Sequence, residues 1–268
     1  MVPHSVIRDI LNVVPMEKIV VDSDFGQMKN GDPIVHHAQF LDVLLNEIGL
    51  SEAQVSLMAK ETPATMVEMS RASELYGMAA FARVYDPGDG PMMSRLLDVG
   101  IHGIMVPLVE TREQADMVIQ YMKFPPLGRR GANGGRGPRW GIYENYARQA
   151  NENLYVIMQC ETRRGLENIE EICQTPGLDC VFIGTGDLSQ DLGYPGETDH
   201  PEVAVAINKI LAACQKYGIV PGIVTAAPDA AVARIKQGFQ LVTCMNDQVF
   251  FRMASEQRIR QIRRGADT

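Results

Sequence analysis

The chain has 268 residues, of which 46% are hydrophobic and 22% charged, and its formal net charge is −8. This length fits either two small domains or one α/β barrel, and the ordinary apolar fraction excludes a disordered chain. The acidic excess argues against nucleic acids and anionic membranes as partners. No apolar run is long enough to cross a bilayer, and the first residues lack the features of a signal peptide.

The cysteine pattern predicts the compartment. The five cysteines include no C-x-x-C pair, and Cys160, Cys180 and Cys244 lie inside apolar runs. A free thiol in such a run behaves as a small buried hydrophobic group. We therefore expect a reduced, cytoplasmic protein.

Eight short apolar runs alternate with longer segments of helical period. The runs are Lys18–Asp22, Gln54–Ala59, Ala79–Arg83, Gly103–Pro107, Tyr155–Gln159, Cys180–Gly184, Val220–Val224 and Leu241–Met245. Near-continuous apolar strands between helices indicate a parallel sheet that is covered by helices. Eight strands with a crossover after each predict a closed (β/α)₈ TIM barrel rather than an open doubly wound sheet.

No linker divides the chain, so residues 1–268 are predicted to form a single TIM-barrel domain. We expect an N-terminal helix within residues 1–17 and a C-terminal helix within residues 246–268. His200-Pro201 marks the start of a long helix that ends at Gly218. The irregular segment 124–140 is predicted to be a functional loop. Its arginines would suit an anionic group of a substrate, although a role in subunit contacts explains them equally well.

The carboxyl ends of the predicted strands carry polar side chains that are suited to catalysis or to ligand binding. Arg83 ends one strand, Gln159 and Glu161 end another, and Asp187 follows the next. Because neighbouring strands lie about 4.8 Å apart, Glu161 and Asp187 are able to hold one cation between them. Two carboxylates without an adjacent His or Cys favour Mg²⁺ or Mn²⁺. The same carboxylates would also suit ion pairs with Arg163 or Arg164, or a helix start.

Several linked motifs carry a resemblance to a known family. They are Gly103-Ile-Met-Val-Pro107, Phe124-Pro-Pro-Leu-Gly-Arg-Arg-Gly131, Gln159-x-Glu161, Val181-Phe-Ile-Gly-x-x-Asp-Leu-Ser189, Leu192-Gly-Tyr-Pro195, His200-Pro-Glu-Val203 and Pro221-Gly222. Together they resemble the HpcH/HpaI aldolase and citrate lyase β-subunit family, and especially its divalent-metal (class II) pyruvate aldolases. The resemblance extends over about two-thirds of the chain and implies a barrel of the phosphoenolpyruvate/pyruvate type.

The resemblance implies a role for each strand-end residue. Glu161 and Asp187 would bind Mg²⁺, Mn²⁺ or another divalent cation, and Gln159 would orient a metal-bound water. The backbone N–H groups of Gly186 and Asp187 would hold the substrate carboxylate, and Arg83 would face the enolate oxygen. This assignment agrees with the chemistry, because an enolate needs positive charge where its oxygen becomes negative.

The sequence departs from the family pattern at two places. The family's aldolases carry a catalytic histidine after strand two, where this chain has Glu61-Thr62. Threonine has no proton affinity near neutral pH and cannot act as that base. His36 or His37 would be substitutes if either reached the barrel mouth, but solvated first-turn histidines explain them as well. In Gly184-Thr-Gly-Asp187, the middle residues replace the usual proline and alanine.

The resulting hypothesis is a metal-dependent carbon–carbon lyase that acts on a 2-keto acid through a pyruvate-type enolate. Its second substrate would be an aldehyde or an acyl-CoA. One alternative is acyl-CoA and oxaloacetate chemistry like that of citrate synthase or citrate lyase. Another is a catalytically altered barrel that serves as a binding subunit, because Thr62 replaces the histidine. The resemblance also implies a homotrimer or homohexamer that exchanges its C-terminal helices.

Overall fold

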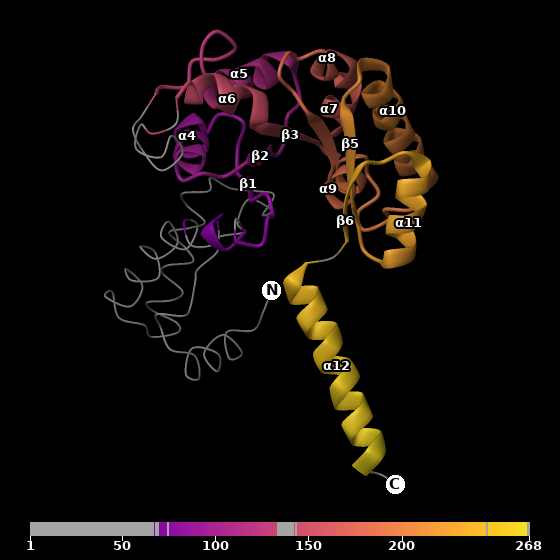
Figure 1. Ribbon diagram of the computed structural model, residues 1–268. Helices are drawn as coiled ribbons and strands as arrows, with labels where there is room; N and C mark the ends of the chain where they lie inside the picture. Colours follow the sequence, from indigo (N-terminus) through magenta and orange to yellow (C-terminus); the bar gives the residue numbers. More distant parts are fainter. Residues whose placement is uncertain are drawn as a thin grey trace, which may run out of the picture.

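The computed structural model describes residues 67, 70–73, 75–132, 142, 144–244 and 246–266. Within these ranges, six strands form one parallel sheet in the order β1-β2-β3-β4-β5-β6. The strands are β1 (Phe81–Arg83), β2 (Gly103–Val106), β3 (Tyr155–Cys160), β4 (Cys180–Ile183), β5 (Val220–Thr225) and β6 (Leu241–Cys244). The sheet curves as a half-barrel (Figure 1).

Six of the eight predicted strands are therefore confirmed to within two residues at each end. The predicted strands at 18–22 and 54–59 and the helix within 1–17 lie outside the described residues. Each strand pairs in parallel with the next strand of the sequence, which is the arrangement that successive βα units of a barrel produce.

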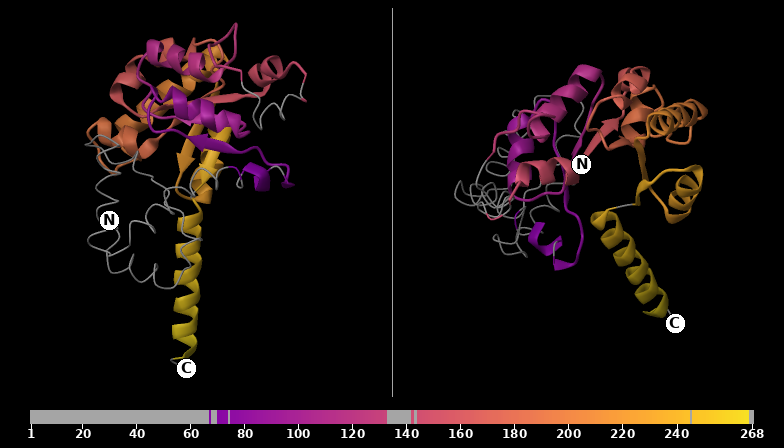
Figure 2. Two further views of the ribbon diagram at one scale, coloured as in Figure 1. Left: turned by 90° about the vertical axis from the view of Figure 1, so that its left-hand side faces the viewer. Right: turned by 45° about the horizontal axis from the view of Figure 1, so that its top comes forward.

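Helices connect the strands along the outer, convex side of the sheet (Figures 1 and 2). They are α4 (Gly90–Asp98), α5 (Arg112–Met122), α6 (Tyr146–Asn153), α7 (Arg163–Glu167), α8 (Ile169–Cys173), α9 (Thr185–Asp191), α10 (Pro201–Tyr217) and α11 (Pro228–Gln237). A further helix, α12 (Asp247–Ala266), follows β6 and extends away from the sheet. The described helices include none that is both long and apolar enough to span a membrane.

Local signals explain where helices begin and end. Before α5, the side chain of Thr111 accepts a hydrogen bond from the backbone of Gln114, whose own side chain accepts one from Thr111. This reciprocal capping satisfies two amides that the helix leaves unpaired. The predicted helix after His200 is confirmed: His200 caps the N-terminus of α10, and Gly218 ends it in the left-handed conformation.

Alternate strand residues face the two sides of the sheet. Outward residues such as Ile104, Met158 and Ile183 are buried against the helices in the main core. Inward residues Ile157, Cys180 and Phe182 form a smaller apolar cluster inside the half-barrel. This alternation with a period of two places Gln159 of β3, and Glu161 directly after β3, above the apolar interior at the carboxyl end of the sheet.

The first residues of the predicted functional loop pack against the folded core. Residues 124–130 fold back on the carboxyl end of α5, where the N–H of Arg129 donates to the carbonyl of Gln120. The Arg130 side chain is buried, donates to Asp98 at 2.8 Å and lies over the Phe124 ring at 4.5 Å. Arg130 is therefore part of the packing rather than an anion-binding group. Residues 133–141 of the loop lie outside the described part.

A buried lysine packs at the amino-terminal end of the sheet, next to the carboxyl end of α5. Lys123 donates from Nζ to the carbonyls of Asn151 and Leu154, at 2.9 and 2.8 Å, just before β3 begins. Burial lowers the pKa of the Lys123 ammonium, while the nearby Asp179 carboxylate acts in the opposite direction. These bonds satisfy carbonyls at the end of α6 that the helix cannot pair.

All five cysteines are free thiols. Cys160, Cys173, Cys180 and Cys214 are buried, which confirms the expectation for Cys160 and Cys180, whereas Cys244 is only partly buried. Burial raises the pKa of Cys160 well above its usual range and that of Cys180 to about 12.

Candidate active site

Three side chains form a hydrogen-bonded row at the carboxyl end of the sheet. The Nε of Arg83, at the end of β1, donates to Oε1 of Gln159 on β3 at 2.6 Å. The Nε2 of Gln159 donates to Oε2 of Glu161 at 3.1 Å. Since β2 lies between β1 and β3, the Arg83 side chain reaches across the end of β2. The amide of Gln159 therefore separates a guanidinium from a carboxylate.

Glu161 is the carboxylate end of this row. Its side chain is buried, with 2% of the residue exposed. Its second oxygen, Oε1, accepts a hydrogen bond from the backbone N–H of Leu108 at 3.1 Å. A carboxylate that accepts an N–H bond at each oxygen is held in one orientation.

Gly184 gives the Glu161 carboxylate its space. A Cβ atom at position 184 would lie 2.5 Å from Oε2 of Glu161, so any other residue there would force the carboxylate to move. Gly184 is also the N-cap residue that directly precedes α9. The first turn of α9 therefore starts directly beside the carboxylate.

Asp187 and Gly186 belong to that first turn. Asp187 is the third residue of α9 and is half-buried. Gly186 is exposed, and a Cβ there would have nothing within 4 Å. Glycine at position 186, where the family pattern has a larger residue, thus leaves open space beside the first turn of α9. The N–H groups of a first helical turn have no partner within the helix, so they are able to donate to a ligand.

The chemistry of these side chains fits a hard divalent cation. Glu161 supplies a buried carboxylate, and Asp187 a second one from the turn that begins at its side. Carboxylate oxygens suit Mg²⁺ and Mn²⁺, which usually keep water or substrate oxygens as further ligands. Among the residues that the structure describes, no group of three or more His, Cys, Asp and Glu is arranged to hold a metal. Within the described ranges, Glu161 and Asp187 are the two carboxylates that the sequence predicts for such a site.

The histidines within the described ranges are away from this row. His102 precedes β2 at the amino end of the sheet, where its Nδ1 accepts the N–H of Ala80 at 3.2 Å. His200 accepts the N–H of Glu202 at the start of α10, as expected of a helix cap. Thr62, His36 and His37 lie outside the described residues.

Sequence reasoning missed two features of the site. The glycine at the end of β4 was a readable signal, because a glycine there often marks a close approach of backbone to another group. The N–H of Leu108 carries no such signal, since every residue except proline has a backbone donor.

The sequence and the fold are similar to those of known proteins. The sequence model of the HpcH/HpaI aldolase/citrate lyase family matches residues 49–253. A 2-keto-3-deoxy-L-rhamnonate aldolase of Escherichia coli is 32% identical, with 80% of this chain and 90% of the relative covered.

Two solved structures are similar as well. One is a member of this family from Burkholderia cenocepacia, with 30% identity, a TM-score of 0.72, and 77% of this chain and 82% of the other covered. The other is the citrate synthase SbnG, with 25% identity, a TM-score of 0.67, and coverage of 76% and 80%.

Proposed function

Since this chain belongs to the HpcH/HpaI aldolase/citrate lyase family, we propose that it is a divalent-metal-dependent aldolase that acts on 2-keto acids through a pyruvate-type enolate. It is an enzyme of the carbon–carbon lyase class. The observation that carries the proposal is the row of Arg83, Gln159 and Glu161 beside the first turn of α9. This row places the guanidinium of Arg83 and the carboxylate of Glu161 at the carboxyl edge of the sheet, where barrel enzymes carry out their reactions.

Glu161 and Asp187 are the proposed ligands of Mg²⁺, Mn²⁺ or a related divalent cation. When bound, such an ion would polarise the 2-keto oxygen of the substrate as a Lewis acid. The N–H groups of Gly186 and Asp187 would hold the substrate carboxylate, for which Gly186 leaves open space.

Arg83 would stabilise the negative charge that develops on the enolate oxygen. Its Nε is bound to Gln159, which fixes the plane of the guanidinium and directs its other N–H groups. Gln159 also bonds Glu161, so its amide lies between the guanidinium and the carboxylate. Its Nε2 carries a second N–H, which is the donor that would orient a bound water.

A second candidate function follows from Thr62, which replaces the family's histidine. Decarboxylation of oxaloacetate forms the same enolate without removal of a proton from carbon. Condensation of an acyl-CoA with oxaloacetate itself, the chemistry named for the citrate synthase that shares this fold, is the other reaction of this candidate. A binding subunit without turnover is the remaining alternative.

Exchange of the C3 hydrogens of pyruvate with D₂O tests the proposed function. We expect exchange by the wild type with Mn²⁺ to exceed that of Glu161→Ala about 100-fold or more, and EDTA to abolish it, since the enolate needs an electrophile at its oxygen. Equal exchange by wild type and variant would refute the proposal. Mn²⁺-dependent decarboxylation of oxaloacetate without pyruvate exchange would favour the second candidate instead.

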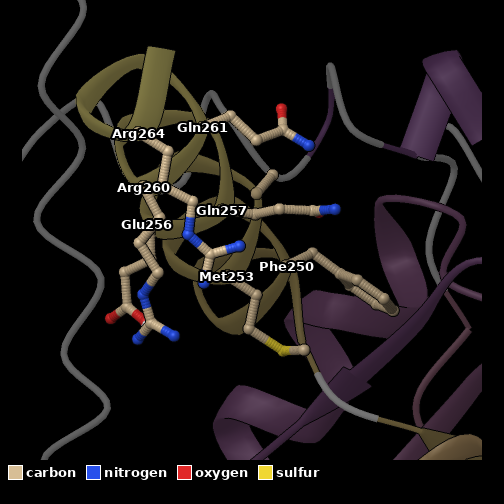
Figure 3. Close-up of a pocket in the computed structure, with 8 residues that line it drawn as sticks. Phe250, Met253, Glu256, Gln257, Arg260, Gln261 and Arg264 are labelled. Atoms are coloured by element: carbon tan, nitrogen blue, oxygen red, sulfur yellow. The ribbon is translucent and has the colours of Figure 1, made fainter. Parts of the chain in front are cut away.

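We further propose that the chain is a homo-oligomer, a trimer or hexamer, in which α12 packs on another copy. In Figures 1 and 2, α12 extends away from the sheet and the other helices. Its large apolar side chains are exposed, with Phe251 at 77% and Ile262 at 71%. Figure 3 draws the α12 side chains that line one pocket, whose volume is about 670 Å³. The neighbouring helix of the sequence, α11, buries none of its residues. The proposed substrate is a small-molecule 2-keto acid, as family membership suggests. The five free thiols fit a reduced, cytoplasmic setting.

Light scattering after size-exclusion chromatography tests the proposed oligomer. The double substitution Phe251→Asp with Ile262→Asp is expected to reduce a trimer or hexamer to monomers, because it places two charges in an apolar contact. Arg258→Asp on the same helix is the control and should keep the wild-type mass. A wild-type monomer, or a double variant with unchanged mass, would contradict the proposal.

A further inference from the structure

Leu108 has an unusual backbone conformation at the edge of the candidate site. It follows β2 and Pro107, and its φ of 54° lies in the left-handed region. A leucine adopts this region rarely, because its Cβ crowds the backbone. Conformations of this kind persist only where the surroundings enforce them, and they gather at functional sites.

The conformation lets two successive N–H groups face the same neighbour. The N–H of Leu108 donates to Oε1 of Glu161 at 3.1 Å, and the N–H of Val109 donates to the carbonyl of Gln159 at 3.3 Å. In an extended strand, successive N–H groups point to opposite sides. The left-handed residue therefore turns the end of β2 so that both donors are directed at β3.

The segment after Leu108 is held from several directions. A Cβ at Gly165 would lie 3.0 Å from the carbonyl oxygen of Val109, so α7 packs tightly on this backbone. The Nδ2 of Asn168 donates to the carbonyl of Glu110 at 2.8 Å. The capped start of α5 at Thr111 fixes the other end. These contacts enforce the conformation of Leu108.

We propose that Leu108 is a positioning residue whose backbone N–H holds the Glu161 carboxylate in the orientation that binds the cation. Gln159 holds the other oxygen, so the carboxylate is fixed at both ends. The inference rests on the proposed function for the identity of the ligand. The role belongs to the backbone of Leu108, whose side chain is 41% exposed.

Two substitutions separate the backbone from the side chain. Leu108→Gly removes the side chain and favours a positive φ, whereas Leu108→Val keeps an apolar side chain but is β-branched and disfavours a positive φ. We expect Leu108→Val to weaken Mn²⁺ binding, measured by isothermal titration, about 10-fold or more, which is typical for the loss of a group that supports a metal ligand. Leu108→Gly should stay within about twofold of the wild type. Leu127→Val, at a leucine 45% exposed beyond the far end of α5, is the control.

Hydrogen exchange in the metal-free protein provides an independent measurement. The amide of Leu108 should exchange slowly in the wild type and about 10-fold faster or more in Glu161→Ala, because the buried acceptor is lost. Equal exchange rates in the two proteins would overturn the proposal, as would a Leu108→Gly variant that binds Mn²⁺ more weakly than Leu108→Val. If the wild type bound no Mn²⁺, the metal assignment would fail, and the exchange comparison alone would decide whether Leu108 positions Glu161.

Discussion

Replacement of Asp187 by asparagine is expected to lower kcat/KM about 10³-fold, which corresponds to about 4 kcal/mol of transition-state stabilisation. The substitution keeps the size of the side chain but removes one of the two negative charges proposed to hold the cation. Mn²⁺ affinity, measured by titration, should fall together with activity. Because Asp187 is half-buried in the first turn of α9, the melting temperature should change little.

Asp191 provides the matched control for this experiment. It lies four residues further along α9, and its Oδ2 accepts the N–H of Arg163 at 2.7 Å, a bond that the side-chain oxygen of an asparagine is also able to accept. Asp191→Asn should therefore keep both Mn²⁺ affinity and kcat/KM near the wild-type values. If Asp187→Asn were no worse than Asp191→Asn in both measurements, Asp187 would not be a metal ligand.

Replacement of Arg83 by lysine is expected to lower kcat about 10²- to 10³-fold with a much smaller change in KM. The guanidinium bonds Gln159 through Nε and still has N–H groups for a substrate oxygen. A lysine ammonium is a compact charge on a flexible chain and cannot reproduce this planar arrangement. The loss should therefore appear where charge develops, in the transition state.

Steady-state kinetics with a 2-keto acid and Mn²⁺ distinguishes the roles of Arg83. Arg95→Lys, on the exposed surface of α4, is the control and should change neither constant. A rise in KM at unchanged kcat would show that Arg83 binds the ground state and transition state equally, which would refute its role at the enolate oxygen.

The strands were predictable because a buried parallel strand needs a continuous apolar sequence on both faces. The runs at 155–159 and 180–184 therefore coincide with β3 and β4 almost residue for residue. The grouping of Arg83, Gln159 and Glu161 also followed from sequence, since strand ends of a parallel sheet meet at one edge. Their individual hydrogen bonds did not, because these depend on which side chain crosses β2.

Arg130 shows where composition misleads. A loop rich in arginine and glycine suggests an anion site, yet Arg130 is buried between Asp98 and the ring of Phe124. Nothing in the local pattern distinguishes an arginine that packs from one that binds, because Asp98 lies 32 residues away in the chain. The position of α12 could not be predicted from local patterns either. An amphipathic helix has the same pattern whether its apolar face packs on its own chain or on another copy.

The buried thiols have a practical consequence for studies of how this chain unfolds. Only a thiolate reacts with alkylating reagents, and burial keeps Cys160, Cys173, Cys180 and Cys214 away from them, while Cys244 is partly accessible. The four buried thiols are spread from β3 to α10, through the centre of the described sheet. The native chain therefore carries one accessible position for a spectroscopic label and four silent ones. The rate at which the four buried thiols are alkylated therefore measures how fast the core opens.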